Sequence, residues 1–132
     1  MNTKRFIIAS ISVFVTFLVL DFLIHGVILS DTYAALQGVW RSDMNRIMWM
    51  MYLATFVFSF VFTWLFVRGY RKGEIMEGLV FGLVMGTGMN IMAAMGQYVM
   101  YPLPGALCVK WFIFGTIEYC IAGIIASTVY SD

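Results

Sequence analysis

Charged residues are scarce in this chain of 132 residues, and their scarcity limits the class of protein. Lysine, arginine, aspartate and glutamate together make up 11% of the sequence, whereas a typical soluble domain holds about 25%. A soluble domain of this size buries too little of its surface to hide so many apolar side chains. The net charge of +1 also gives no electrostatic basis for binding nucleic acid. The composition therefore excludes an ordinary soluble domain and predicts no nucleic-acid partner.

Histidine and cysteine, which commonly bind haem and soft metals, are nearly missing. His25 is the only histidine, so a bis-histidine haem site cannot form within one chain. Cys108 and Cys120 fall on one predicted helix, about 18 Å apart along its axis, which is beyond the reach of a disulfide. The sequence has no phosphate-binding glycine loop and no nucleophile motif. We therefore predict no cofactor and no enzymatic activity.

Long apolar runs fill most of the chain. Hydrophobic residues make up 62% of it, and four windows have the roughly 20 mostly apolar residues that cross a bilayer as a helix. These windows are residues 6–29, 47–67, 75–101 and 107–129. The last two connections are short, which predicts that the second, third and fourth helices are antiparallel neighbours. We predict an all-α polytopic membrane protein, a single domain over residues 1–132 with four transmembrane helices in an antiparallel bundle.

The longest connection, residues 31–45, has the pattern of an amphipathic helix. Apolar side chains recur every three or four positions, Tyr33 and Trp40 among them, while Arg41 and other polar residues occupy the remaining faces. Tyrosine and tryptophan are enriched where a bilayer meets water. The pattern predicts an interfacial helix that lies along the membrane surface. The alternative is an irregular loop.

Basic residues are divided unequally between the two ends of the predicted bundle. Lys4, Arg5, Arg68, Arg71 and Lys72 fall at one end, and Arg41, Arg46 and Lys110 fall at the other. The cytoplasmic loops of membrane proteins carry the excess of lysine and arginine. The sequence therefore predicts a bacterial inner-membrane protein with both termini in the cytoplasm.

Glycines recur every four positions along the third predicted span, at Gly78, Gly82 and Gly86. The fourth span carries Gly115 and Gly123 among other small residues. Glycine at this spacing lets two helix backbones approach closely, which favours helix association in lipid. We predict that the third and fourth helices pack through these faces. The sequence leaves open the alternative that one such face forms a homodimer.

Four polar residues are predicted to lie at membrane depth. Asp21 and His25 are one turn apart on the first span, Asn90 is on the third, and Glu118 is near the middle of the fourth. An ionisable group inside a bilayer costs a few kcal/mol and usually faces the bundle interior or water. These residues are therefore the candidates for an intramembrane polar or ion site.

The intramembrane cluster has two interpretations. A carboxylate one helical turn from an imidazole can hold its tautomer, as in proton relays and metal sites, so the cluster could pass protons or bind a divalent cation. The more common explanation of such a cluster is structural, because polar groups also hold a bundle in register. Gln97 and Lys110 form a shallower polar layer near the predicted outer surface. The sequence assigns no metal to these residues.

The chain also resembles a family of small four-helix bacterial membrane proteins. The resemblance lies in the pattern Asp-x3-His-Gly, followed by Tyr and Trp-Arg, and it continues through the glycine-rich third span, so that it covers most of the chain. The residues that carry it are Asp21, His25, Gly26, Tyr33, Trp40, Arg41, Trp111, Glu118 and Gly123. The resemblance implies a four-helix membrane fold and no particular activity.

These observations favour a non-enzymatic accessory or scaffold component of a membrane. Its expected partners are the lipid bilayer and either another membrane protein or a second copy of the chain. The first alternative is a small oligomeric transporter or channel subunit that uses Asp21, His25 and Glu118 for a proton or cation. The second alternative is a redox subunit that binds quinone or haem in a pocket lined by tyrosine and tryptophan.

Overall fold

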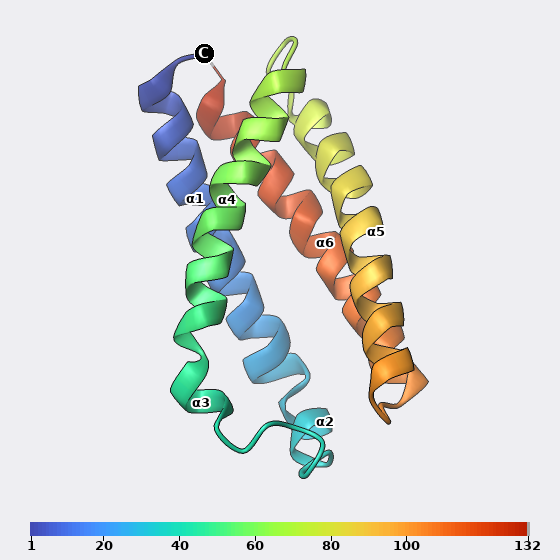
Figure 1. Ribbon diagram of the computed structural model, residues 1–132. Coiled ribbons are helices and arrows are strands. Elements are labelled where there is room, and N and C mark those ends of the chain that lie inside the picture. The colour runs from blue at the N-terminus through green and yellow to red at the C-terminus, as the bar shows by residue number, and fades with distance from the viewer. Residues whose placement is uncertain (132) are drawn as a thin grey trace.

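The computed structural model describes residues 1–131, and most of them are helical. In chain order the helices are α1 (Thr3–Asp21), the π-helix η1 (Phe22–Ile28), α2 (Ser30–Ala34), α3 (Met44–Ile47), α4 (Trp49–Gly69), α5 (Ile75–Met100) and α6 (Gly105–Tyr130). Four stretches are long and apolar enough to cross a membrane: Thr3–Ile28, Met44–Gly69, Ile75–Met100 and Gly105–Tyr130. The prediction of an all-α membrane protein with four spans is confirmed (Figure 1).

The ends of the helices follow local sequence signals. Asn2 caps α1, because its side-chain oxygen accepts the backbone N–H of Arg5 at 3.1 Å. The turn between α4 and α5 contains Gly73 at a φ of +76°, a conformation that glycine adopts without strain. The prolines at Pro102 and Pro104 cannot continue α5, and α6 begins directly after Pro104.

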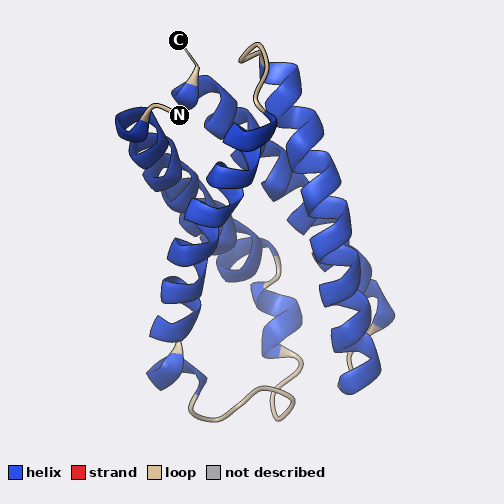
Figure 2. Cartoon of the chain, turned by 45° about the horizontal axis from the view of Figure 1, so that its top comes forward, coloured by secondary structure: helices blue, strands red, loops and turns tan. Residues whose placement is uncertain are grey.

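The spans are arranged as two pairs. α1 packs along α4, α5 packs along α6, and contact between α1 and α6 joins the pairs. Both termini and the α4–α5 turn lie at one end, which we call the terminus end (Figure 2). The opposite end, the loop end, carries α2, α3 and the α5–α6 turn. The two pairs diverge toward the loop end (Figure 1).

Aromatic residues fill the core at the terminus end. The ring of Phe62 on α4 contacts those of Phe17 on α1, Phe81 on α5 and Tyr119 on α6. Helices α4 and α5, predicted to be neighbours from their short turn, thus meet through Phe81 near that turn. Beyond it they separate, because α4 packs its phenylalanines on α1 while α5 packs its glycines on α6.

The glycines of α5 and α6 lie where the two backbones touch. A Cβ atom built on Gly78 would stand 2.1 Å from the backbone oxygen of Gly123, and one on Gly82 would stand 2.2 Å from that of Tyr119. A Cβ on Gly86 would also crowd Tyr119, and one on Gly115 would meet the Asn90 side chain. These faces therefore contact each other within one chain, which leaves the α5 face unavailable for a homodimer.

The connection between the first two spans differs from the continuous helix predicted over residues 31–45. Helix α2 ends at Ala34, turns follow, and helical structure resumes in α3. Gly38 has a φ of +94°, a left-handed conformation that an α-helix does not accommodate. Trp40 also folds back, since its Nε1–H donates to the Tyr33 carbonyl at 3.1 Å. The predicted helix is thus present only in its first turn, over residues 31–34, and again from Met44.

Candidate functional site

Asp21 and Glu118 meet between α1 and α6. Glu118 lies near the middle of α6 and is 6% exposed, and its carboxyl lies within interaction range of that of Asp21, the last residue of α1. We call these two residues the carboxyl pair. Ionised carboxylates accept hydrogen bonds but cannot donate them, so two carboxyls at close range can hydrogen-bond to each other only when they hold a proton between them.

His25 on η1 stands beside the carboxyl pair. Its Nε2 lies 4.0 Å from Asp21 Oδ1, which is close enough for an ion pair but too far for a hydrogen bond. A spacing of four residues would align the two side chains on an α-helix. The backbone that follows Asp21 is instead a π-helix, which has a wider turn with i→i+5 bonding and occurs frequently at functional sites.

Tyr33 on α2 joins His25 to the last span. Its hydroxyl lies 2.5 Å from His25 Nδ1 and accepts the Nε1–H of Trp111 at 2.6 Å. The rings of His25 and Tyr33 are stacked, with centroids 5.9 Å apart and planes at 16°. Burial raises the pKa of Tyr33 above its usual 10.0. A continuous chain of polar contacts, the polar chain, thus runs Trp111–Tyr33–His25–Asp21–Glu118.

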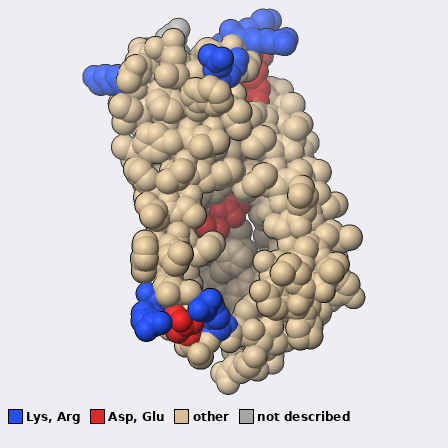
Figure 3. Space-filling view, in the orientation of Figure 1, with Lys and Arg blue, Asp and Glu red and all other residues tan. Residues whose placement is uncertain are grey.

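A hollow in the surface of the bundle exposes part of the polar chain. Figure 3 shows it between α4 and α5, with acidic side chains in its wall midway along the molecule. They belong to the carboxyl pair, because the other described acidic residues lie at or beyond the ends of the spans. The side chains of Asp21 and His25 are 43% and 46% exposed. Carboxyl groups at membrane depth face the bundle interior or water rather than lipid, and this hollow is the opening through which water would reach the carboxyl pair.

On the terminus side of the carboxyl pair the core is closed. Phe17 and Tyr119 pack edge to face at 5.4 Å, within the aromatic cluster that also holds Phe62 and Phe66. The fully buried hydroxyls here are already bonded to backbone carbonyls; they are Ser10, Ser59, Thr63 and Ser127. The described side chains therefore form a polar path toward the loop end and not toward the terminus end.

Asn90, the fourth residue predicted for the site, and the predicted outer polar layer of Gln97 and Lys110 lie outside the polar chain. Asn90 donates its Nδ2–H to the Gly86 carbonyl at 2.8 Å and packs against Gly115, within the α5–α6 contact. Gln97 and Lys110 are exposed and are not part of the polar chain.

Arg41, predicted at the interface, pairs with Asp43 at 2.8 Å. The hydrogen bond from Arg41 holds the pKa of Asp43 below its usual 3.8. Trp40 and Tyr33, the other two interfacial residues, pack together at the loop end with ring centroids 5.4 Å apart.

Trp111 is a site residue that the sequence reasoning did not assign to the site. Its indole N–H bonds the Tyr33 hydroxyl and so ties α2 to α6. A signal was present in the spacing, because Trp111 precedes Glu118 by two helical turns and lies on the same face of α6. Nothing in the sequence pattern indicated that Tyr33, on a separate element, would be the shared partner.

The chemistry of the cluster suits protons better than metal ions. Among residues 1–131, no three His, Cys, Asp or Glu side chains are placed to hold a metal ion together. The polar chain instead contains alternating donors and acceptors: an indole, a phenol, an imidazole and two carboxyls. Each of the last four can both accept and release a proton or hydrogen bond.

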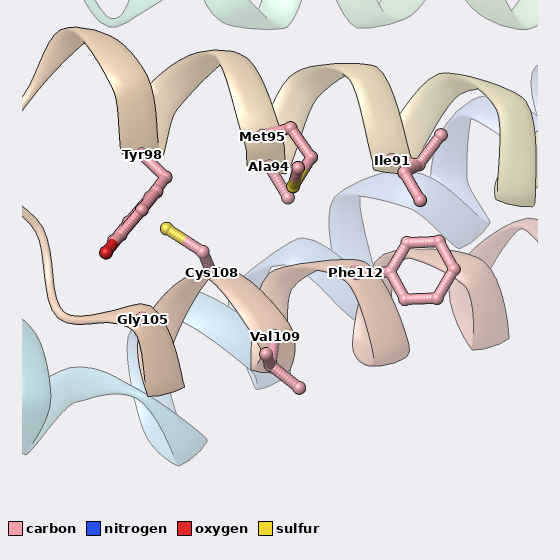
Figure 4. A pocket seen from close by; sticks show the side chains of 8 residues that line it. All are labelled: Ile91, Ala94, Met95, Tyr98, Gly105, Cys108, Val109 and Phe112. Carbon is pink, nitrogen blue, oxygen red and sulfur yellow. The ribbon is translucent and has the colours of Figure 1, made fainter.

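A separate apolar crevice of about 330 Å³ lies between α5 and α6 near the loop end. In Figure 4, Tyr98 extends from α5 toward α6, where Cys108 and Phe112 form the opposite wall. None of the residues that line it belongs to the polar chain. The crevice and the carboxyl pair are therefore distinct features.

Comparison of the chain with models of known protein families, with curated proteins and with solved structures found no match. The carboxyl pair and its connection to the loop end are accordingly interpreted from their geometry and from their position within membrane-spanning helices.

Proposed function

We propose that this protein is a small proton-binding membrane protein, a transporter or channel subunit whose proton site is the carboxyl pair. The observation that carries the proposal is the buried carboxyl of Glu118, which lies beside the carboxyl of Asp21 and near His25 at membrane depth. Intramembrane carboxyl and histidine chains mark proton pathways in pumps and transporters. Histidine changes charge near neutral pH, so His25 is suited to pass protons between this pair and water.

The orientation of the chain determines which side supplies the proton. Five of the eight basic residues lie at the terminus end: Lys4, Arg5, Arg68, Arg71 and Lys72. The positive-inside rule then puts the terminus end in the cytoplasm of a bacterial inner membrane. The hollow and His25 face the outside in this orientation, and the aromatic core separates the pair from the cytoplasm.

Transport would require a second arrangement of the same helices. A transporter exposes its site to each side of the membrane in turn, largely by rigid movement of one helix bundle against another. The α5–α6 pair is one natural rigid body, since its glycines hold the two backbones in contact. Helix α1 packs against both α4 and α6, so this movement would have to break its contact with α6. Separation of the pairs at the aromatic core would expose the carboxyl pair to the cytoplasm.

An accessory role through the glycine face of the third span is less well supported. The sequence left open that this face binds a second copy of the chain, but α6 occupies it, with glycine backbones in direct contact. A partner would have to bind another surface of the bundle.

The proposal is tested by proton flux into liposomes that contain the purified protein and a pH-sensitive dye. We expect Glu118→Gln, which keeps the shape and hydrogen-bonding capacity of the side chain but cannot release a proton, to reduce flux to that of empty liposomes. Glu74→Gln is the matched control, because Glu74 is an exposed carboxylate at the terminus end and its loss should leave flux unchanged. Wild-type flux in folded Glu118→Gln would contradict the proposal.

A further inference from the structure

The hydrogen bonds around Tyr33 determine which nitrogen of His25 carries the proton. The indole of Trp111 can only donate, so the 2.6 Å contact makes the Tyr33 oxygen its acceptor. The Tyr33 hydrogen then has an acceptor in His25 Nδ1, 2.5 Å away. Because a neutral imidazole has one accepting and one donating nitrogen, the hydrogen of His25 is on Nε2.

The opposite tautomer satisfies fewer groups. A hydrogen on Nδ1 would make the Tyr33 oxygen accept two hydrogen bonds, from His25 and from Trp111. The Tyr33 hydrogen would then have no protein partner among the described residues and would have to turn to water, in a side chain that is half buried. Losing an acceptor that is already in place is unfavourable, so the network favours the Nε2–H form.

The Nε2–H form directs the imidazole proton at the carboxyl pair. Nε2 is the atom that lies 4.0 Å from Asp21 Oδ1, and a closure of about 1 Å would bring the two into hydrogen-bond range. The titratable groups that face His25 are Asp21 of α1 and Tyr33 of α2. Glu118 of α6 acts on it through Asp21, and Trp111 acts on it through Tyr33.

We propose that Tyr33 is the positioning residue of the proton site, which holds His25 in the tautomer whose N–H faces Asp21 and connects it to water at the loop end. The transfer that we infer rests on the proposed function, whereas the tautomer does not. In one concerted relay, hydronium at the loop end gives a proton to the Tyr33 oxygen and becomes water, the Tyr33 hydrogen moves to Nδ1, and the Nε2 hydrogen moves to a carboxylate oxygen of Asp21. One proton is gained by the carboxyl pair, and Tyr33 and His25 each gain one and lose one. Tyr33 then favours the return of His25 to its starting tautomer.

The tautomer is measurable without ambiguity because His25 is the only histidine in the chain. Protein labelled with ¹⁵N-histidine gives two ring-nitrogen resonances, whose shifts identify the protonated atom when the ring is neutral. We expect wild type to show protonated Nε2. Tyr33→Phe removes the donor to Nδ1 and should give a mixture of tautomers. Trp111→Phe frees the Tyr33 oxygen to accept from Nδ1 and should shift the spectrum in the same direction.

Tyr98→Phe is the control, because Tyr98 lines the separate crevice and its hydroxyl is not part of the polar chain. Protonated Nδ1 in wild type, or a spectrum unchanged by both Tyr33→Phe and Trp111→Phe, would overturn the inference. In the liposome assay, Tyr33→Phe should lower flux about tenfold, the scale of effect expected when a group that orients a functional imidazole is lost. If the wild-type spectrum is as expected but wild-type protein carries no proton flux, the proposed function fails and the positioning of His25 by Tyr33 stands.

Discussion

Polar side chains within this bundle differ in whether they bond their own helix or another element. Thr63 and Asn90 donate to the carbonyl four residues earlier on their own helix, as serine and threonine commonly do. Tyr33 instead bonds Trp111 on another helix, and Asp21 and Glu118 meet between α1 and α6. Groups of the first kind are satisfied locally, whereas groups of the second kind connect helices.

Thr116 belongs to neither group, since its buried hydroxyl oxygen has no hydrogen-bond partner among the described residues. Such a group costs about 1–3 kcal/mol, whereas an apolar group of the same shape has no such cost. We expect Thr116→Val to raise the free energy of unfolding by about 1 kcal/mol, measured by denaturant titration in detergent micelles. Thr63→Val, which removes a bonded hydroxyl, should give no such gain. Equal or lower stability of Thr116→Val would show that its hydroxyl is satisfied in the membrane.

Among the helices, α5 and α6 depend most on close backbone contact. Gly82 leaves no room for a methyl group, because the nearest atoms belong to the backbone of Tyr119 and Cys120, which cannot move without displacing α6. Gly88, on the same helix, is exposed, and no atom lies within 4 Å of the place that a methyl group would take there. The two glycines therefore differ in environment while sharing the same helix.

We expect Gly82→Ala to destabilise the folded chain by about 1–3 kcal/mol, as overpacking does in tightly packed cores. Gly88→Ala should be neutral or should stabilise it by up to about 1 kcal/mol, because alanine is the better helix former. Unfolding monitored by circular dichroism in micelles measures both, and light scattering reports the oligomeric state. A Gly82→Ala variant that unfolds like wild type but changes its oligomeric state would place this face in a contact between chains.

The positions of the spans could be predicted from the sequence because they depend on length and hydropathy alone. Two features of the elements could not. The break at Gly38 depends on a left-handed backbone that composition does not reveal, and the π-helix after Asp21 preserves the apolar pattern while widening the turn. Asp21, His25 and Glu118 could be chosen by depth and residue type. The exclusion of Asn90 could not, since spacing gives the face of a helix but not whether a side chain bonds its own backbone.

At the scale of the whole molecule, the two ends of the bundle differ in charge and in packing. The terminus end combines most of the basic residues with the aromatic core, and the loop end combines α2, the hollow and His25. A membrane distinguishes two such ends by their positive charge. The proposed function depends on which end faces the cytoplasm.

Single cysteines introduced into a chain without Cys108 and Cys120 would test this orientation. Gln37 is exposed at the loop end and Lys72 is exposed at the terminus end. We expect a membrane-impermeant maleimide to label Gln37→Cys in intact cells and to label Lys72→Cys only after the cells are permeabilised, as the distribution of basic residues dictates. The reverse pattern would mean that the hollow opens to the cytoplasm.

The two helical pairs contact each other at the terminus end and diverge toward the loop end, so each pair forms an arm that is joined to the other arm at one end. The joint is the aromatic core at the terminus end, and each arm is a span of 26 residues, about 39 Å long. A rotation of about 5° at the joint would therefore move the tip of an arm by about 3 Å, which is enough to break a hydrogen bond that joins the two arms, such as the one from Trp111 of α6 to Tyr33 of α2. Lateral pressure from the lipids acts on the tips with the longest lever, so the thickness and tension of the bilayer would act on the contact between Tyr33 and Trp111 before any other.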